Sequence, residues 1–272
     1  MSSLRFELHA ASVLAPGLAS LDDLREACRR GTPPEPTAPL ILPAPAVLPA
    51  NERRRASPVV RLTLACIEQA LQSSPFKVET LRSVFATDEG TGEVCDQMLE
   101  VIATTRQVSP LVFPNTVQNA ASGFFSIAWR NRQPATVASL GLESFASGLL
   151  CAVTDAVATG QPVLLVAYDP AMTGPMRELL PITDHTATAW ILSAAPAFAD
   201  VPVLGSFVLD LEPQGTTPPS AMPPWLPAAW SGHSSARALA ALGLLEAAEG
   251  SCFRMTLGGQ LLSIRRVAEA SS

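Results

Sequence analysis

The hydrophobic positions along the chain repeat with different periods in different segments. Residues 5–14 alternate between apolar and polar side chains, which predicts a strand with one buried face. Residues 161–169 form a continuous apolar run that ends at Tyr168 and Asp169, which is typical of a central strand buried on both faces. Shorter apolar runs predict further strands at 82–86, 136–141 (expected to be buried), 187–193 and 201–211.

Helical spacing and capping residues predict helices between these strands. Ser20 and Asp23 have the spacing of a capping box, and Ser57 before Pro58 combines a cap with a proline at the first helical position. We therefore expect helices to begin after Ser20 and after Ser57. Further helices are expected at about 93–105, after Pro114, at 143–158 and at 234–248, and the first of these should bury Val94, Met98, Val101 and Ile102.

Strands and helices alternate over most of the chain, which favours an α/β fold with right-handed crossovers. Proline-rich stretches at 33–49 and 213–227 indicate extended connections on the surface. The segment 252–267 has the pattern of a β-hairpin that turns at Gly258 and Gly259.

Composition and charge narrow the function classes. Of the 272 residues, 48% are apolar and 15% are charged, and the net charge is −6 with a single lysine. The chain has no basic stripe, so we expect no nucleic-acid partner. No apolar run of about eighteen residues is free of proline and charge. The N-terminus lacks the pattern of a signal peptide, so we expect a cytoplasmic protein without a membrane span.

Metal and phosphate sites are not expected from the motifs. The cysteines are scattered, with no paired spacing, so neither a zinc site nor a disulfide framework is expected. The glycines within 87–94 lack the lysine and the spacing of a phosphate loop. In 141–145, Glu143 occupies the central position that a hydrolase elbow reserves for serine.

Candidate acid–base residues are few. His9, His185 and His233 lie in no spacing that orients a nucleophile, and a structural or surface role is favoured for His185 beside Asp184. Tyr168 and Asp169 end a central strand, where α/β sheets often bind ligands. A simple strand exit is the favoured interpretation of that pair.

One segment resembles a known family. Residues 109–169 contain, in order, Pro114-Asn115, the helix sequence Gly123-Phe124-Phe125-Ser126-Ile127, Gln133-Pro134, the predicted strand 136–141 and the strand sequence VLLVAYD. This order resembles the segment around the nucleophile of β-ketoacyl-ACP synthases, and residues 6–31 resemble the first strand and helix of those enzymes. The resemblance is weaker over 1–105 and fades after about residue 195.

The resemblance implies a thiolase-like α/β fold. One half would be complete, with a central mixed sheet flanked by helices, and the second half would be strongly reduced. On this basis 1–272 is a single ketosynthase-like domain. Its N-terminal ketosynthase-like half would span 1–195, and a truncated C-terminal part with a helix and a β-hairpin would span 196–272.

The chain departs from that family at the residues that carry the chemistry. Counting on from Pro134, the position of the catalytic cysteine falls at Leu142, between Gly141 and Glu143. Leucine has no nucleophilic atom, so no acyl thioester can form there. The two catalytic histidines of the family lie in His-Gly-Thr and Gly-His contexts. The chain has no His-Gly pair, and we expect both histidines to be missing.

A shortened ketosynthase-like chain of this kind resembles the chain length factors, most of all the short ketosynthase N-terminal-domain-like type of aryl polyene and xanthomonadin-like pathways. The resemblance implies a subunit without catalysis or cofactor of its own. Such a subunit pairs with a catalytic β-ketoacyl-ACP synthase, meets an acyl carrier protein transiently and shapes the acyl tunnel.

In the family, the equivalents of 113–127 and 136–141 cross the dimer interface. The residues expected at the tunnel or the interface are Phe113, Asn115, Thr116, Val117, Ala120, Phe124, Phe125, Ser139, Leu140 and Leu142. Because Phe113, Thr116, Val117, Ala120 and Phe124 have near-helical spacing, several are expected to share one inward face.

Two other functions stay open from the sequence. The chain could be an acyltransferase or hydrolase that uses Ser139, Ser144 or His185, or it could be a stand-alone acyl-binding homodimer. An acyl adduct on the isolated chain would favour the enzyme. Size-exclusion chromatography with and without a ketosynthase would separate the homodimer from a heterodimer.

Overall fold

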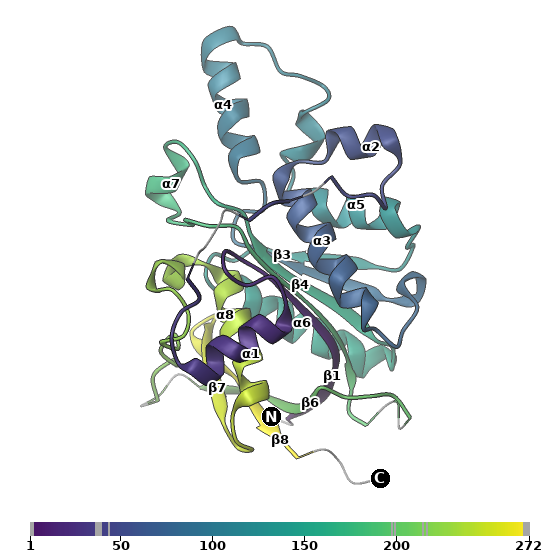
Figure 1. Cartoon of the computed structure of the whole chain (residues 1–272), viewed down its shortest axis with the longest axis vertical. Helices are drawn as coiled ribbons and strands as arrows, with labels where there is room; N and C mark the ends of the chain where they lie inside the picture. The colour runs from purple at the N-terminus through teal and green to yellow at the C-terminus, as the bar shows by residue number, and fades with distance from the viewer. Residues whose placement is uncertain are drawn as a thin grey trace.

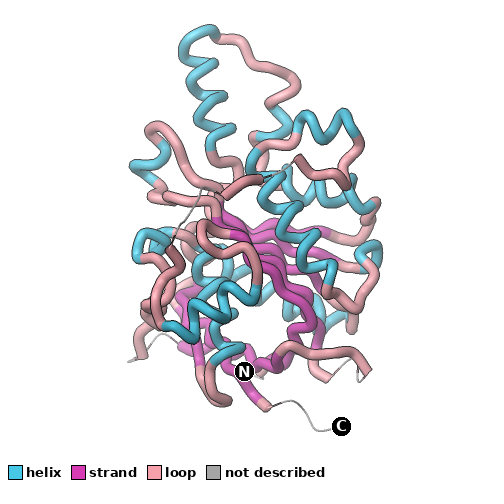
Figure 2. Tube along the Cα trace, in the orientation of Figure 1, coloured by secondary structure: helices cyan, strands magenta, loops and turns pink. Residues whose placement is uncertain are grey.

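A single mixed β-sheet forms the centre of the protein, whose computed structural model describes residues 3–35, 40–42, 44–196, 198, 200–213, 215 and 217–268. Eight strands lie in the order β3-β2-β4-β5-β1-β6-β8-β7 (Figure 1, Figure 2). β2 is parallel to both β3 and β4, and the remaining pairs among these strands are antiparallel. The strands are β1 (Leu4–Leu14), β2 (Arg82–Ala86), β3 (Ala135–Ala138), β4 (Val163–Asp169), β5 (Thr186–Ala194), β6 (Gly205–Pro213), β7 (Cys252–Leu257) and β8 (Gln260–Val267).

Helices cover both faces of this sheet. On one face lie α3 (Pro58–Gln72) and α5 (Ala120–Trp129), and on the other lie α6 (Ser144–Thr159) and α8 (Ser234–Leu242), with α1 (Leu21–Arg30) beside β1. Outside these layers, α4 (Glu93–Thr105) extends away from the body (Figure 1). The shorter helices are α2 (Ala50–Arg55), α7 (Met176–Leu179), η1 (Val78–Thr80), η2 (Phe113–Asn115), η3 (Ala228–Gly232) and η4 (Gly243–Glu246).

The predicted helix starts are confirmed by their capping hydrogen bonds. Ser20 Oγ accepts from the backbone N–H of Asp23 at 3.1 Å, and the Asp23 carboxylate accepts from the backbone N–H of Ala19 at 2.9 Å. Ser57 Oγ accepts from the backbone N–H of Val60 at 3.4 Å. Each cap satisfies backbone donors that the first helical turn leaves without partners, which fixes where α1 and α3 begin.

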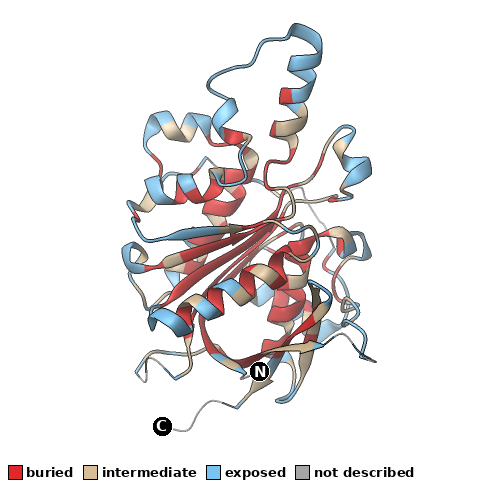
Figure 3. Ribbon diagram, turned by 180° about the vertical axis from the view of Figure 1, so that it is seen from behind, coloured by how far each residue is buried: buried red, intermediate tan, exposed pale blue. Residues whose placement is uncertain are grey.

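Two hydrophobic cores lie on the two sides of the sheet. The cluster under α3 and α5 includes Phe85, Phe125 and Tyr168, and the cluster under α6 and α8 includes Phe145 and Trp190. As predicted, every residue of β4 is buried. The burial pattern in Figure 3 follows these layers, with the strands inside and the α4 arm exposed.

Three predicted burial patterns are wrong. β1 is buried on both faces, not one, because α3 covers one side and α1 and α6 cover the other. β3 is the outermost strand on its side and is largely exposed, so the segment 136–141 is not a buried strand. In α4, Val101 and Ile102 are 40% and 43% exposed, because the outer half of this helix extends away from the described body of the protein (Figure 1).

The C-terminal part extends the same sheet and does not build a second one. β6, β8 and β7 continue outward from β1, and the sheet curls so that β7 contacts α6 and α8 (Figure 3). The predicted hairpin is confirmed, with left-handed backbone at Gly258 and Gly259. The predicted helix at 234–248 is shorter than expected, since α8 ends at Leu242 and continues as η4.

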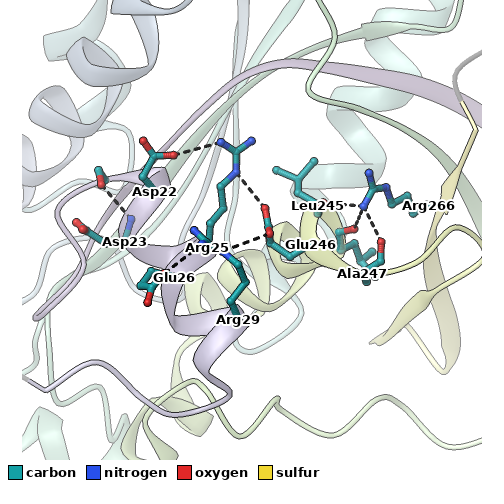
Figure 4. Close-up of polar contacts among 11 residues, drawn as sticks. Asp22, Asp23, Arg25, Glu26, Arg29, Leu245, Glu246, Ala247 and Arg266 are labelled. Atoms are coloured by element: carbon teal, nitrogen blue, oxygen red, sulfur yellow. Dashed lines mark hydrogen bonds and ion pairs between the residues drawn. The ribbon is translucent and has the colours of Figure 1, made fainter.

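Polar contacts tie the first helix to this C-terminal part (Figure 4). Arg25 and Arg29 of α1 approach the carboxylate of Glu246 at 3.3 and 3.8 Å. Arg266 of β8 donates to the backbone oxygens of Leu245 and Ala247, both at 2.6 Å. The segment around η4 is therefore held by α1 on one side and by β8 on the other.

One described segment, Gly141–Thr159, has the length and hydropathy of a membrane-crossing helix. It coincides with α6, whose inner side packs against the sheet through Phe145, Leu149 and Val153. The segment also contains Glu143 and Asp155. Its apolar composition is accounted for by its place between the sheet and the C-terminal strands.

Candidate functional site

The carboxyl ends of the parallel strands β2, β3 and β4 meet at one edge of the sheet. The chain passes from β2 to β3 over one face and from β3 to β4 over the other, which makes this edge a switch point of the topology. Asp88 follows β2, Ser139 to Leu142 follow β3, and Asp169 ends β4. Two helix N-termini converge on the same edge, because Ser234 Oγ of α8 accepts from the backbone N–H of Phe145 in α6 at 2.8 Å.

Asp169 joins these elements from a fully buried position. Its carboxylate accepts from the backbone N–H of Asp88 at 2.8 Å, from the backbone N–H of Ser235 at 2.6 Å and from Ser235 Oγ at 2.7 Å. A carboxylate at the first turn of α8 is also favoured by the positive end of the helix dipole. Asp169 therefore has a structural role, and its described hydrogen bonds all lie inside the protein. It does more than end a strand, because it joins β4 to the loop after β2 and to α8.

His233 extends this network and is also buried. The backbone N–H of Thr183 donates to His233 Nε2 at 3.1 Å, so the ring proton lies on Nδ1, which donates to Thr186 Oγ1 at 3.2 Å. Thr186 in turn contacts Ser235 Oγ, which donates to Asp169. Burial lowers the pKa of His233 and outweighs the nearby Asp169 and Asp184, so the ring is neutral.

The sequence analysis overlooked the signal that could have found this histidine. Gly232-His233 is a Gly-His pair directly before a helix, the context attributed to one of the family's histidines. The expectation that both of the family's histidines are missing stays a prediction, and Gly232-His233 has the sequence context of one of them. His233 is present, but both of its ring nitrogens are engaged and none of it is exposed.

Asp88, which follows β2, is a half-buried titratable group at this edge of the sheet. Burial raises its pKa to about 6, with further contributions from Asp169 and Glu89, while Arg237 acts in the opposite direction. Glu89 itself accepts from the backbone N–H groups of Thr91 and Gly92 at 2.8 and 2.7 Å. The carboxylate of Glu89 thus fixes the conformation of the loop after β2. Among the described residues, no group of three His, Cys, Asp or Glu side chains has the arrangement of a metal site.

In the turn between β3 and α6, Ser144 keeps its hydroxyl inside, while Glu143 accepts from the backbone N–H of Gly258 in the hairpin. Ser144 Oγ accepts from the backbone N–H of Leu140 at 2.8 Å and donates to the backbone oxygen of Gly141 at 2.6 Å. Gly141 has φ +59°, which a side chain would strain. Leu140 and Leu142 point outward, at 52% and 41% exposure. The turn therefore presents two leucines and no nucleophile.

The segment before α5 lies against this turn. Ser139 Oγ accepts from Gln118 Nε2 at 3.0 Å and donates to the backbone oxygen of Asp88 at 2.6 Å. Phe113 and Val117 are 58% and 41% exposed in the same segment. The contact between Gln118 and Ser139 places their neighbours Val117 and Leu140 in one region of the surface, and Phe113 and Leu142 are exposed in the same two segments.

The remaining proposed site residues are placed differently. Phe124 and Phe125 are core side chains, Thr116 and Ala120 are half-buried, and Asn115 is buried and donates to the backbone oxygen of Arg55 at 3.0 Å. α5 begins only at Ala120, because 113–115 form a separate 3-10 turn. Phe113 to Phe124 therefore do not share one inward helical face.

The serines and the histidine of the alternative enzyme function do not form a catalytic arrangement. Ser144 is fully buried and spends its hydroxyl on the turn. His185 Nδ1 accepts from the backbone N–H of Ala171 at 3.0 Å, and burial lowers the pKa of this ring. The described hydrogen bonds join neither Ser139 nor Ser144 to a histidine.

Many exposed apolar side chains lie between residues 99 and 142. We use the name apolar surface for ten of them, which are Leu99, Val101, Ile102, Val108, Leu111, Val112, Phe113, Val117, Leu140 and Leu142. The eleventh in this range, Ile127, lies on α5. The outer edge of β3 adjoins this region, and no described strand pairs with it. Exposed apolar groups beside an open strand edge mark a surface that a partner covers.

The structure defines the class of this protein as a mixed α/β fold with helices on both faces of one sheet and a switch point at the carboxyl ends of β2, β3 and β4. Residues 26–210 match the family of β-ketoacyl synthase N-terminal domains, and the chain belongs to that family. A search of the curated proteins gave no match.

Solved structures share the fold at low sequence identity. A chain in the complex of a ketosynthase with its chain length factor from Xenorhabdus doucetiae is 21% identical with a TM-score of 0.70, over 97% of this chain and 100% of that one. The ishigamide ketosynthase/chain length factor gives 12% and 0.71, over 97% and 99% of the two chains. A ketosynthase of the bacillaene synthase from Bacillus amyloliquefaciens gives 10% and 0.58, over 79% of this chain and 46% of that one.

Proposed function

We propose that the chain is a chain-length-factor-like subunit, without catalysis of its own, that forms a heterodimer with a full-length β-ketoacyl-ACP synthase. The observation that carries this proposal is the turn after β3. Where the resemblance puts a cysteine, the turn exposes Leu140 and Leu142. An apolar contact surface in place of a nucleophile supports binding and removes acyl transfer.

The state of His233 supports the same conclusion. A histidine that assists condensation must present a ring nitrogen to the substrate. Both nitrogens of His233 are engaged by Thr183 and Thr186, and the ring is fully buried. Neither the turn nor the histidine therefore offers a reactive atom to an acyl thioester.

Structures of ketosynthase pairs are among those that share the fold of this chain. Matches to chains from four structures cover 97% of this chain and 99–100% of theirs. Three of these structures are a ketosynthase with its chain length factor, a ketosynthase/chain length factor, and an acyl-carrier protein with its ketosynthase, and the fourth is a β-ketoacyl synthase from Burkholderia phymatum. Two bacillaene ketosynthases are covered for only 46% of their length. This chain has the size of the short chains.

The open edge of β3 supplies a geometry for the heterodimer. Backbone oxygens of Pro134 and Ala138 accept from β2, so the alternating positions 135 and 137 direct their backbone groups to the open side. A strand of the partner can pair there and extend the sheet, while apolar contacts form along α4 and η2. Both features would otherwise be left exposed.

The tunnel-shaping role follows from the same surface. Phe113, Val117, Leu140 and Leu142 would close the end of a tunnel that begins at the partner's cysteine, and Ala120 and Thr116 lie behind them. Phe124 and Phe125 would set the wall from the core side. We place this role in type II fatty-acid or polyketide-like biosynthesis in the cytoplasm, and the resemblance to chain length factors of aryl polyene pathways favours that type of pathway.

The test is co-expression with the ketosynthase encoded beside this chain, followed by light scattering on a size-exclusion column. We expect a 1:1 complex and a product that neither subunit makes alone. Ala120→Phe should shorten the product and Phe113→Ala should lengthen it. A well-behaved monomer that binds no such ketosynthase contradicts the heterodimer. If the Ala120 and Phe113 variants weaken the complex but the product that still forms keeps its length, the tunnel role is contradicted and the heterodimer is not.

A further inference from the structure

The curl of the sheet leaves a hollow between α6 and the C-terminal strands. In the sheet order β1-β6-β8-β7, α6 packs against β1 and β7. The two strands between them, β6 and β8, form the far wall of the hollow together with the start of β1. Its volume is about 380 Å³. Five leucines line it, and we call it the leucine hollow: Leu4, Leu150, Leu209, Leu211 and Leu262.

The leucine hollow has a buried floor and an open mouth. Leu209 and Leu262 are 2% and 0% exposed and form the floor. Leu4 and Leu211 are half-buried at the mouth, and Thr154 of α6 is an exposed lining residue at the rim. A concave site of this volume, with an apolar wall and a few polar groups, is typical of small-molecule binding.

The charge at the rim is neutralised within the protein. Asp210 lines the hollow, and its carboxylate forms an ion pair with Arg265 at 3.0 Å. Thr154 adds an uncharged hydroxyl. The hollow therefore does not select a ligand by charge, and recognition depends on the apolar part of the ligand.

A peptide finds no backbone partner on the floor of the hollow. Leu209 pairs with β1 on one side and with β8 on the other, and Leu262 pairs with β6 and β7. An added strand needs an unpaired sheet edge, which these positions do not offer. An aliphatic chain fits this floor because it gains from burial and has no polar groups that need partners.

We propose that the leucine hollow binds the aliphatic tail of a single-tailed lipid, such as a free fatty acid, whose head group stays in solvent beside Thr154. The hollow shares no residue with the apolar surface or with β3. Binding there is therefore independent of the pairing with a ketosynthase. The affinity should grow with each methylene group that leaves water.

The test measures the fluorescence of cis-parinaric acid, a conjugated fatty acid that brightens in apolar sites, on titration with the purified full chain. We expect saturation at one probe per chain. Thr154→Trp puts a large ring at the rim and should raise Kd at least about tenfold. The control is Thr159→Trp, the same change at an exposed position of α6 that does not line the hollow, and it should leave Kd within about twofold.

Displacement of the probe tests recognition of the tail. Dodecanoic acid should displace it at least about tenfold more strongly than octanoic acid, because more methylene groups are buried. Dodecan-1-ol should match dodecanoic acid within about threefold, because the head group is not bound. Displacement by the acid and not by the alcohol would place the site at a surface charge and overturn the proposal.

A second variant keeps the test valid if Thr154→Trp does not fold. Leu211→Asn, at the half-buried mouth, should raise Kd about threefold. Unchanged probe binding in both variants overturns the proposal. If the wild-type chain forms dimers that Thr154→Trp converts to monomers, a second copy covers the hollow and the lipid proposal is wrong. The heterodimer is tested separately, by binding of the ketosynthase.

Discussion

The ends of β3 and β4 lie at the same edge of the sheet and have opposite character. At the end of β4, Asp169 and His233 are fully buried and their polar atoms are paired with N–H and hydroxyl groups. At the end of β3, Leu140 and Leu142 are exposed and the strand edge has no described partner. The buried polar groups at the end of β4 thus hold neighbouring elements together, while the end of β3 leaves apolar side chains open to contact. Four experiments test this contrast.

The largest effect is expected at the buried end. Asp169→Ala would leave the backbone N–H groups of Asp88 and Ser235 without their acceptor, inside the protein. We expect the free energy of unfolding to fall by about 3 kcal/mol or more, measured by denaturant unfolding. Asp22→Ala, at a side chain that is 86% exposed, is the control and should change it by less than about 0.5 kcal/mol. A decrease of less than about 1 kcal/mol for Asp169→Ala would show that the end of β4 does not have the structural role that distinguishes it from the end of β3.

The open end is tested by blocking the edge of β3. Ala135→Pro removes an outward backbone N–H while leaving the hydrogen bonds to β2 in place, so the affinity for the ketosynthase should fall about tenfold, or ~1.4 kcal/mol. Ala135→Val keeps the N–H group and should bind like the wild type. Kd values from surface plasmon resonance decide this. Equal affinity of the proline and valine variants would exclude strand pairing at this edge.

A smaller effect is expected at Asp88, between the two ends. Because burial raises its pKa to about 6 from 3.8, the folded protein binds the proton more tightly than the unfolded chain, and this group lowers stability as pH rises through that window. Asp88→Asn should therefore stabilise the protein at pH 7.5 by about 1 kcal/mol, after allowance for its partial exposure, and have little effect at pH 3.5.

The comparison of the two proteins at each pH isolates Asp88. The pKa of His9, His185 and His233 is lowered by burial, so their contribution is lost as pH falls through about 6.5, but it is common to both proteins. Thermal unfolding at several pH values provides the measurement. A stabilisation that is the same at pH 3.5 and 7.5 would show that the charge of Asp88 is not its source.

The smallest expected effect is that of Leu142→Cys, which should create no condensation activity. Leu142→Cys puts a thiol at the turn, yet His233 is buried with both nitrogens engaged and has no free nitrogen to activate it. The purified variant without a ketosynthase should form no condensation product from acyl and malonyl carrier proteins, as judged by mass spectrometry. Any such product would mean that the buried network opens to the turn.

Sequence patterns located the elements better than their surroundings. The starts of α1 and α3, the fully buried β4 and the closing hairpin follow from caps, apolar runs and turn glycines, which act over a few residues. The exposure of Val101 and Ile102 could not be predicted, since helical spacing says which residues share a face and not whether anything covers it. Phe124 and Phe125, two of the proposed site residues, lie in the core. The spacing could not predict this either, because it does not show that α5 packs on the sheet.

The sequence by itself determined the α/β class and the family resemblance, and that resemblance implies a leucine at the position of the nucleophile. These depend on local pattern and on the identity of single residues. Only the tertiary structure decided that β3 is an open edge and that Asp169, Ser235, Thr186 and His233 form one buried chain of hydrogen bonds. Those residues are up to 66 positions apart, and the pairing of strands and helices that brings them together is set by packing over the whole chain.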